Sequence, residues 1–147
     1  MTANVLNRFK QPVSGSQDNP LILGGTVETA DGQSLKKFVL TTQIEDISTA
    51  GQTYVVSPFA GTITKIYSVL NGAISGANSI LTPKIGGTAI TNGAITVAFS
   101  GSAAGHIDSS TPTALNAVTA GQAIEIETDG GSTGTVKTVL TIEITLS

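Results

Sequence analysis

Apolar and polar residues alternate through most of the chain after residue 37, which is the pattern of half-buried β-strands. The clearest case is residues 135–146, where the polar face carries Lys137, Thr141, Glu143 and Thr145. Its apolar face consists of Val136, Leu140, Ile142, Ile144 and Leu146. The same pattern predicts seven further strands. These lie at about residues 38–45, 53–57, 62–70, 79–85, 88–91, 94–100 and 122–128.

Two of the turns between these strands have the composition of hairpin loops. The glycine-rich segment 129–134 separates the last two strands, and its glycines accept the positive φ that such a loop requires. Asn92-Gly93, a strong hairpin signal, separates the strands before and after it. We therefore predict a C-terminal hairpin and a second hairpin closed by Asn92-Gly93.

The number of strands and the scarcity of helical pattern define the fold class. Eight strands with irregular connections favour an all-β, antiparallel β-sandwich or jelly-roll-like domain, here predicted over residues 38–147. Residues 113–118 alone suggest a helical turn. Before the domain, residues 1–37 contain Pro12, Pro20 and several glycines, and only a short apolar run. Because proline restricts its neighbourhood to extended geometry, we predict an extended N-terminal arm, with a disordered leader as the alternative.

Composition narrows the class of protein. The 147 residues suit a single domain, and the absence of cysteine excludes disulfides and thiolate chemistry. Only 12% of residues are charged and the net charge is −3, which disfavours a nucleic-acid partner, because that affinity needs basic side chains. No run of apolar residues is long enough to span a membrane and no secretory signal is evident, so we expect a soluble protein made in the cytoplasm.

Candidate catalytic residues are few. His106 is the only histidine, and Ser102 and Asp108 lie close to it in the sequence. A catalytic triad usually assembles from separate segments, and residues 101–105 do not form the Gly-x-Ser-x-Gly elbow. Glu125 and Glu127 share one face of a strand, as a glycosidase pair would, but a solvated face explains them better. We therefore expect no enzyme.

Candidate metal sites are equally incomplete. His106 and Asp108 alternate, so a strand would place them on one face as half of a site. Asp129-Gly130-Gly131 is similar to a calcium-binding turn but supplies a single carboxylate. No phosphate-binding or dinucleotide-binding glycine motif is present. The sequence therefore predicts no cofactor and no metal.

Three segments resemble a known group of proteins. Residues 55–67, 95–105 and 120–132 are similar in turn and strand pattern to small β-proteins of tailed-phage virions, especially the head decoration, or cement, proteins. The resemblance covers about residues 50–147. It implies a jelly-roll-like domain, commonly a homotrimer, that is fixed to the capsid exterior and stabilises the shell. Fibre-tip domains share this composition.

We therefore expect a non-enzymatic virion protein located on the capsid surface. Its partners would be the major capsid protein and further copies of itself, and linked contacts would multiply its affinity. The candidate capsid-contact residues are Arg8, Phe9, Lys10, Leu21, Ile22, Leu23, Lys36 and Lys37. The alternative is a receptor-binding or glycan-binding tip domain, against which the absence of tryptophan argues. A hydrolase that uses His106 is a distant third.

Overall fold

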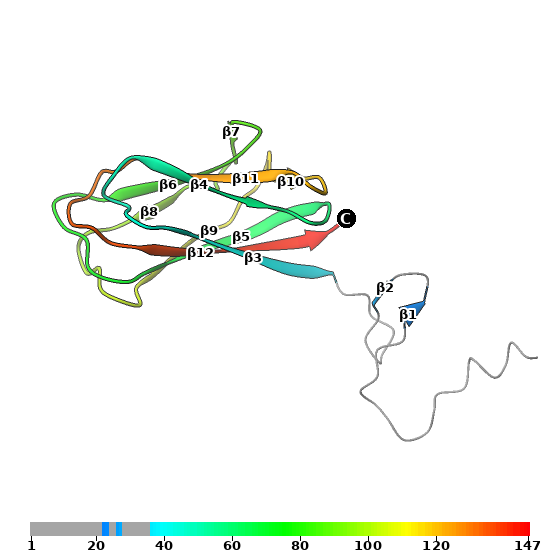
Figure 1. The fold of residues 1–147 in the computed structure, drawn as a ribbon, viewed down its shortest axis with the longest axis horizontal. Coiled ribbons are helices and arrows are strands. Elements are labelled where there is room, and N and C mark those ends of the chain that lie inside the picture. Colours follow the sequence, from blue (N-terminus) through cyan, green and yellow to red (C-terminus); the bar gives the residue numbers. More distant parts are fainter. Residues whose placement is uncertain (1–21, 24–25, 28–35) are drawn as a thin grey trace, which may run out of the picture. The chain divides into compact units, whose positions relative to one another are not determined.

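The computed structural model describes the backbone of residues 22–23 and 26–27, and the backbone and side chains of residues 36–147 (Figure 1). Contacts divide the chain into two units, Met1–Leu35 and Lys36–Ser147. In the first unit, β1 (Ile22–Leu23) pairs antiparallel with β2 (Thr26–Val27). The rest of the predicted arm up to residue 35 lies outside the described residues. The second unit begins at Lys36, two residues before the predicted start of the domain.

The second unit is built from two antiparallel sheets that face each other (Figure 1). Sheet 1 contains β10 (Ala117–Val118), β5 (Gly61–Leu70), β12 (Thr138–Leu146) and β3 (Lys37–Ile44) in that order, with β9 (Ile107–Ser110) also paired to β5. Sheet 2 contains β4 (Gly51–Val56), β11 (Ala123–Thr128), β6 (Ser79–Ile85) and β7 (Thr88–Ala89), with β8 (Ile95–Val97) also paired to β6. The predicted all-β sandwich is confirmed.

The order of the strands is that of a jelly roll. The first strand of the sandwich, β3, pairs with the last, β12, and β4 pairs with β11. Further inward, β5 pairs with β9 and β10, and β6 pairs with β7 and β8. The chain is thus one long antiparallel ribbon, which is rolled up so that β12 also meets β5 and β11 also meets β6. Such a roll buries one face of each sheet without any helix.

The core lies between the two sheets and follows the alternation in the sequence. In β12, Leu140, Ile142 and Ile144 are fully buried, whereas the residues between them face outward. In β5 the alternation changes phase, because Thr64 has no partner on β12 and forms a β-bulge. Ile63 and Ile66 therefore both point into the core although they are three residues apart. The bulge explains how one strand keeps its apolar side chains inside on both sides of a bend.

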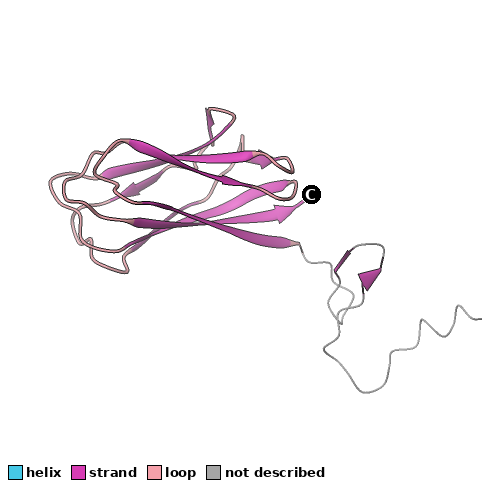
Figure 2. Cartoon of the chain, in the orientation of Figure 1, coloured by secondary structure: helices cyan, strands magenta, loops and turns pink. Residues whose placement is uncertain are grey.

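Two predictions about local structure are wrong. The strands on either side of residues 129–134 form no hairpin, because β11 belongs to sheet 2 and β12 belongs to sheet 1. The segment between them instead crosses from one sheet to the other, about 10 Å away. The helical turn at residues 113–118 is absent as well. Thr91 bridges Ala114, and Ala117–Val118 pair with β5. Figure 2 shows strands and loops in the described part of the chain, and no helix.

The hairpin predicted at Asn92-Gly93 is also wrong, and Pro83 supplies the reason. Both β7 and β8 pair with β6, and the hairpin between β6 and β7 turns at Gly86-Gly87 instead. Pro83 lies in the middle of β6 and accepts a hydrogen bond from the backbone N–H of Ile90 at 2.9 Å. Because proline has no N–H to return, the neighbouring strand leaves β6 there and rejoins it at Ile95.

Asn92 and Gly93 occupy the interruption that Pro83 creates. Asn92 has a φ of 56°, the left-handed geometry that asparagine tolerates. Gly93 is buried against the proline ring, since a Cβ atom on Gly93 would lie 2.9 Å from Cγ of Pro83. The Asn-Gly pair therefore forms a bulge inside one edge strand, rather than a turn between two strands.

A small cluster of hydroxyl groups holds the loops at one end of the sandwich. Oγ of Ser79 lies 2.9 Å from the carbonyl oxygen of Ile47 and 2.9 Å from Oγ of Ser132. Oγ1 of Thr128 donates to the same carbonyl oxygen at 3.0 Å. All four residues are buried. The cluster therefore joins the loop between β3 and β4 to the start of β6 and the end of β11.

Candidate functional site

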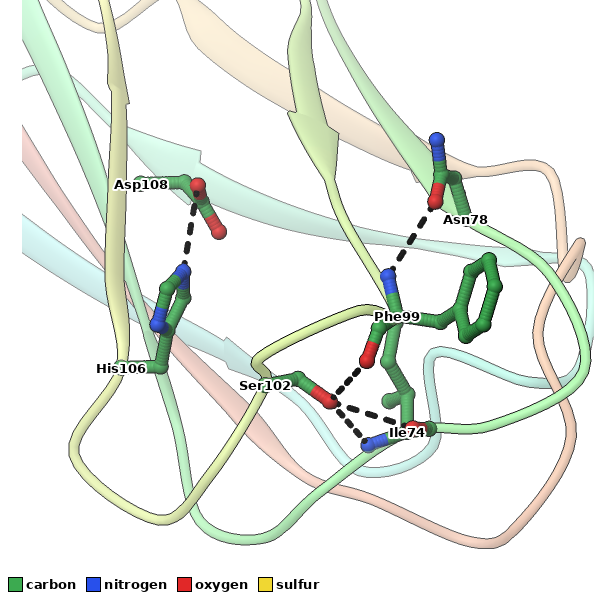
Figure 3. Close-up of polar contacts among 6 residues, drawn as sticks. All are labelled: Ile74, Asn78, Phe99, Ser102, His106 and Asp108. Atoms are coloured by element: carbon green, nitrogen blue, oxygen red, sulfur yellow. Dashed lines mark hydrogen bonds and ion pairs between the residues drawn. The ribbon is translucent and has the colours of Figure 1, made fainter.

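The three residues of the suspected triad do not assemble (Figure 3). Nε2 of His106 lies 3.5 Å from Oδ1 of Asp108, so the two side chains share a face as the alternation predicts. Ser102 points elsewhere: its hydroxyl oxygen accepts from the backbone N–H of Ile74 at 3.0 Å and lies 2.9 Å from the carbonyl oxygen of Phe99. Ser102 therefore joins two loops, and its hydroxyl oxygen is not positioned as a nucleophile beside the imidazole.

The second carboxylate oxygen of Asp108 is unusual because it is buried without a hydrogen-bond partner among the described residues. Oδ2 of Asp108 is buried, and so is Oγ of Ser68, and neither has a hydrogen-bond partner among the described residues. Ser68 on β5 lies directly opposite Asp108 on β9. Groups of three or more histidine or acidic side chains, which could hold a metal ion, do not occur in the described part of the chain.

The acidic residues of sheet 2 interact with neighbours in the protein. Glu125 and Glu127 lie on the outer face of β11, and the carboxylate of Glu127 pairs with the ammonium group of Lys84. The hydrogen bond that Lys84 donates to Glu127 raises the pKa of Lys84 above its usual value. Oδ1 of Asp129 accepts from the backbone N–H groups of Ile80 and Gly131, at 2.9 and 3.0 Å. These two hydrogen bonds fix the loop that follows β11.

The predicted capsid-contact residues fall into three groups. Outside the described residues lie Arg8, Phe9, Lys10 and Leu21. The backbone alone is described for Ile22 and Leu23, which form β1. Lys36 and Lys37 are exposed at the start of β3, where the carbonyl oxygen of Lys36 accepts from the backbone N–H of Leu146 at 2.7 Å. The structure thus places two of the predicted basic residues together, at the point where the chain enters the sandwich.

The outer face of sheet 1 carries a row of apolar side chains beside an open hollow. Val69 of β5 lies between Val139 of β12 and Ile107 of β9, and Tyr67 lies in the next outward-facing row of the same strands. We call these four residues the apolar face. Ile107 is 61% exposed. The four residues line an open hollow of about 330 Å³ together with Ser68 and Thr141.

The surroundings of the apolar face are polar but mostly uncharged. A second open hollow of about 300 Å³ shares Val139 and is otherwise lined by Thr41, Thr42 and Gln43. A charged group borders this region. Nζ of Lys65 is 5.7 Å from the centre of the Tyr67 ring and 3.0 Å from the hydroxyl oxygen of Thr111. The result is a broad, shallow surface of valine, isoleucine, tyrosine and hydroxyl groups.

The composition of this surface is similar to that of protein-contact surfaces. Protein interfaces have a centre depleted of charge, enriched in aromatic residues and surrounded by polar groups. This face is not among the features predicted from the sequence. One signal was present: Val139 lies on the outward-facing side of the last strand, between Lys137 and Thr141. A single valine in a polar row is common, so the patch becomes visible only when neighbouring strands are paired.

Comparison of the chain with models of known protein families and with curated proteins found no match. The described residues contain no helix of the length and apolar character that a membrane crossing requires.

Proposed function

We propose that this protein is a virion structural protein that decorates and stabilises a phage capsid from outside. In this proposal the apolar face of sheet 1 docks on the major capsid protein, the arm of residues 1–37 adds further contacts, and copies of the sandwich associate with one another. The protein performs no chemical reaction. The resemblance implies a trimer, and the mass of the full-length protein in solution tests how many copies associate.

The observation that carries the proposal is a partly apolar sheet face, bordered by Lys65, on a jelly roll in which the hydroxyl group of Ser102 contacts loop backbone instead of His106. Val69, Val139 and Ile107 form a row across three strands, and Tyr67 lies beside it. Ile107 is exposed and the other three residues are half-buried, and contiguous apolar surface that reaches the solvent marks sites of protein contact. The jelly roll also occurs in viral capsid proteins, although a fold alone does not define a function.

The contact residues suggest how affinity is reached. A shallow face gives modest affinity alone, and a tethered second contact raises it through effective concentration. Lys36 and Lys37 are exposed at the junction of arm and sandwich, where they can meet acidic groups of the shell. Weak contacts of several kinds therefore combine on one capsid site.

Binding to undecorated capsids tests the proposal. Ile107→Asp places a charge in the apolar face at an exposed position, and we expect it to weaken binding about tenfold or more. Val56→Asp is the matched control, because Val56 is 56% exposed on the outer face of the other sheet. Deletion of residues 1–20 should also weaken binding. Undiminished binding by Ile107→Asp would reject the docking face, and undiminished binding by the deletion would reject the arm.

A receptor-binding or glycan-binding tip domain is the second candidate, and Tyr67 is the observation in its favour. The ring of Tyr67 lines the larger hollow beside the hydroxyl-bearing Thr141, and aromatic rings with nearby polar groups are typical of carbohydrate sites. A glycan array separates the two functions. Hits that disappear in Tyr67→Ala, together with failure of the protein to bind capsids, would favour the tip domain.

A further inference from the structure

The two sides of the sandwich differ in how their edge strands are protected. On one side the edges are interrupted: β9 and β10 are separated by residues 111–116, and β7 and β8 by residues 90–94. On the other side β3 and β4 are continuous strands of eight and six residues. Among the described residues, β3 pairs only with β12, and β4 pairs only with β11. Long open edges without interruption are rare in proteins that stay monomeric.

The hydrogen bonds of β3 show which of its backbone groups are open. Lys36 accepts from the N–H of Leu146, so the even-numbered residues of β3 bond to β12. The odd-numbered residues therefore direct their N–H and C=O groups toward the open edge. The side chains of Lys37, Val39, Thr41 and Gln43 are exposed, and so is that of Glu45 just beyond the strand. None of the described residues pairs with this edge of β3.

We propose that two copies of the chain pair along β3, antiparallel and centred on Thr41, so that sheet 1 continues from one copy into the other. In this register Thr41 faces Thr41 of the partner subunit, and both residues offer open backbone groups. Lys37 then faces the partner subunit's Glu45, and the contact is repeated by symmetry at the other end. Registers shifted along the strand separate these opposite charges, so the charge pattern selects this one.

The charges around Glu45 support this assignment. Oε2 of Glu45 lies 2.9 Å from Nζ of Lys137, and Oε1 accepts from the amide nitrogen of Gln43. Asp46 adds a second carboxylate, which is bound to Ser48 and Thr49. Two acids and one lysine leave this end of the edge with a net negative charge. An approaching lysine is therefore attracted, even though Glu45 already has a partner.

The pairing has a consequence for docking, and it rests on the proposed function. An antiparallel pair of strands is related by a twofold axis perpendicular to the sheet, so the outer faces of both copies point in the same direction. The two apolar faces would lie side by side on one surface. Two linked docking faces bind a repetitive shell more tightly than one, because the second contact is intramolecular.

The mass of the full-length protein in solution tests this inference directly. Light scattering coupled to gel filtration, over a range of concentrations, should show a dimer. Lys37→Glu should raise the dissociation constant of the dimer about tenfold, because it creates two like-charge contacts. Glu45→Lys should do the same. The double variant Lys37→Glu with Glu45→Lys should restore the dimer, which a merely structural role of either residue would not explain.

A second pair of variants tests the centre of the register. Thr41→Lys places two ammonium groups against each other across the axis and should give a monomer. Thr141→Lys is the control: it lies in the same outward-facing row, one strand further in, and should remain a dimer. A monomer or a trimer for the unmodified protein, or a dimer insensitive to these changes, would overturn the inference. Ile107→Asp tests the docking face separately, because Ile107 lies on β9 and takes no part in the pairing along β3.

Discussion

Thr42 on β3 and Thr53 on β4 share a hydrogen bond between their hydroxyl groups, with 2.9 Å between the two oxygen atoms. The two strands belong to different sheets, so the bond connects the sheets directly at the open side of the sandwich. Both hydroxyl groups are partly buried. Each loses a protein partner when the other is removed.

This bond predicts non-additive effects. Thr42→Val and Thr53→Val should each lower the free energy of unfolding by about 1 kcal/mol, because one hydroxyl is left without its partner. The double variant should lose clearly less than the sum, because no unpaired hydroxyl remains. Urea unfolding of the four proteins measures the coupling. Strictly additive losses would show that the bond contributes nothing to stability.

The contact between Gly93 and Pro83 predicts a steric effect. Gly93→Ala should lower the free energy of unfolding by about 1–3 kcal/mol, since the new Cβ would lie 2.9 Å from the proline ring and 3.0 Å from Cβ of Ile90. Gly72→Ala is the control, because its nearest contact is an ordinary 3.7 Å to Val136. Chemical denaturation measures both. Equal effects would mean that the close approach at Gly93 is relieved by movement.

Two of the buried serines, Ser68 and Ser79, should respond differently to replacement by alanine. Ser79→Ala removes a hydroxyl that contacts Ile47 and Ser132, and should cost about 1–3 kcal/mol of unfolding free energy. Ser68→Ala removes a buried hydroxyl without a partner among the described residues, and should be neutral or stabilising. Thermal unfolding of both variants provides the comparison. A large loss for Ser68→Ala would reveal a partner of Ser68, such as a bound water molecule.

Asp46 predicts a pH-dependent contribution to stability. Hydrogen bonds from the hydroxyl and backbone N–H of Ser48 hold the pKa of Asp46 below its ordinary value of 3.8. The unfolded carboxylate therefore takes up a proton at a higher pH than the folded one. The contribution of Asp46 is fully present above pH 3.8 and is lost as the pH falls through the folded pKa.

Replacement of Asp46 removes that dependence. Asp46→Asn should be less stable than the unmodified protein near neutral pH, and the difference should shrink below pH 3.8. Urea unfolding midpoints over a series of acidic pH values measure it. A difference that stays constant with pH would show that the folded and unfolded pKa values of Asp46 are equal.

The positions of the long strands were predictable because their alternation is a local property. Leu140, Ile142 and Ile144 lie on the predicted face and fill the core. The short strands β9 and β10 were not predicted, because Ile107–Ser110 and Ala117–Val118 contain too few residues to show a period. The apolar face depends on Ile107, and therefore could not be assembled from the sequence.

Sequence alone determined that this chain forms antiparallel strands with one buried face each, and that it offers little material for catalysis. Tertiary structure decided which strands pair. The segment 129–134 looks like a hairpin loop, yet it connects β11 and β12 across the two sheets. The amino-acid composition of a turn indicates only that the chain changes direction there, and not which strands pair. The choice of partner depends on burying the apolar faces of all strands at once, and that requirement is satisfied by the whole fold rather than by any local segment.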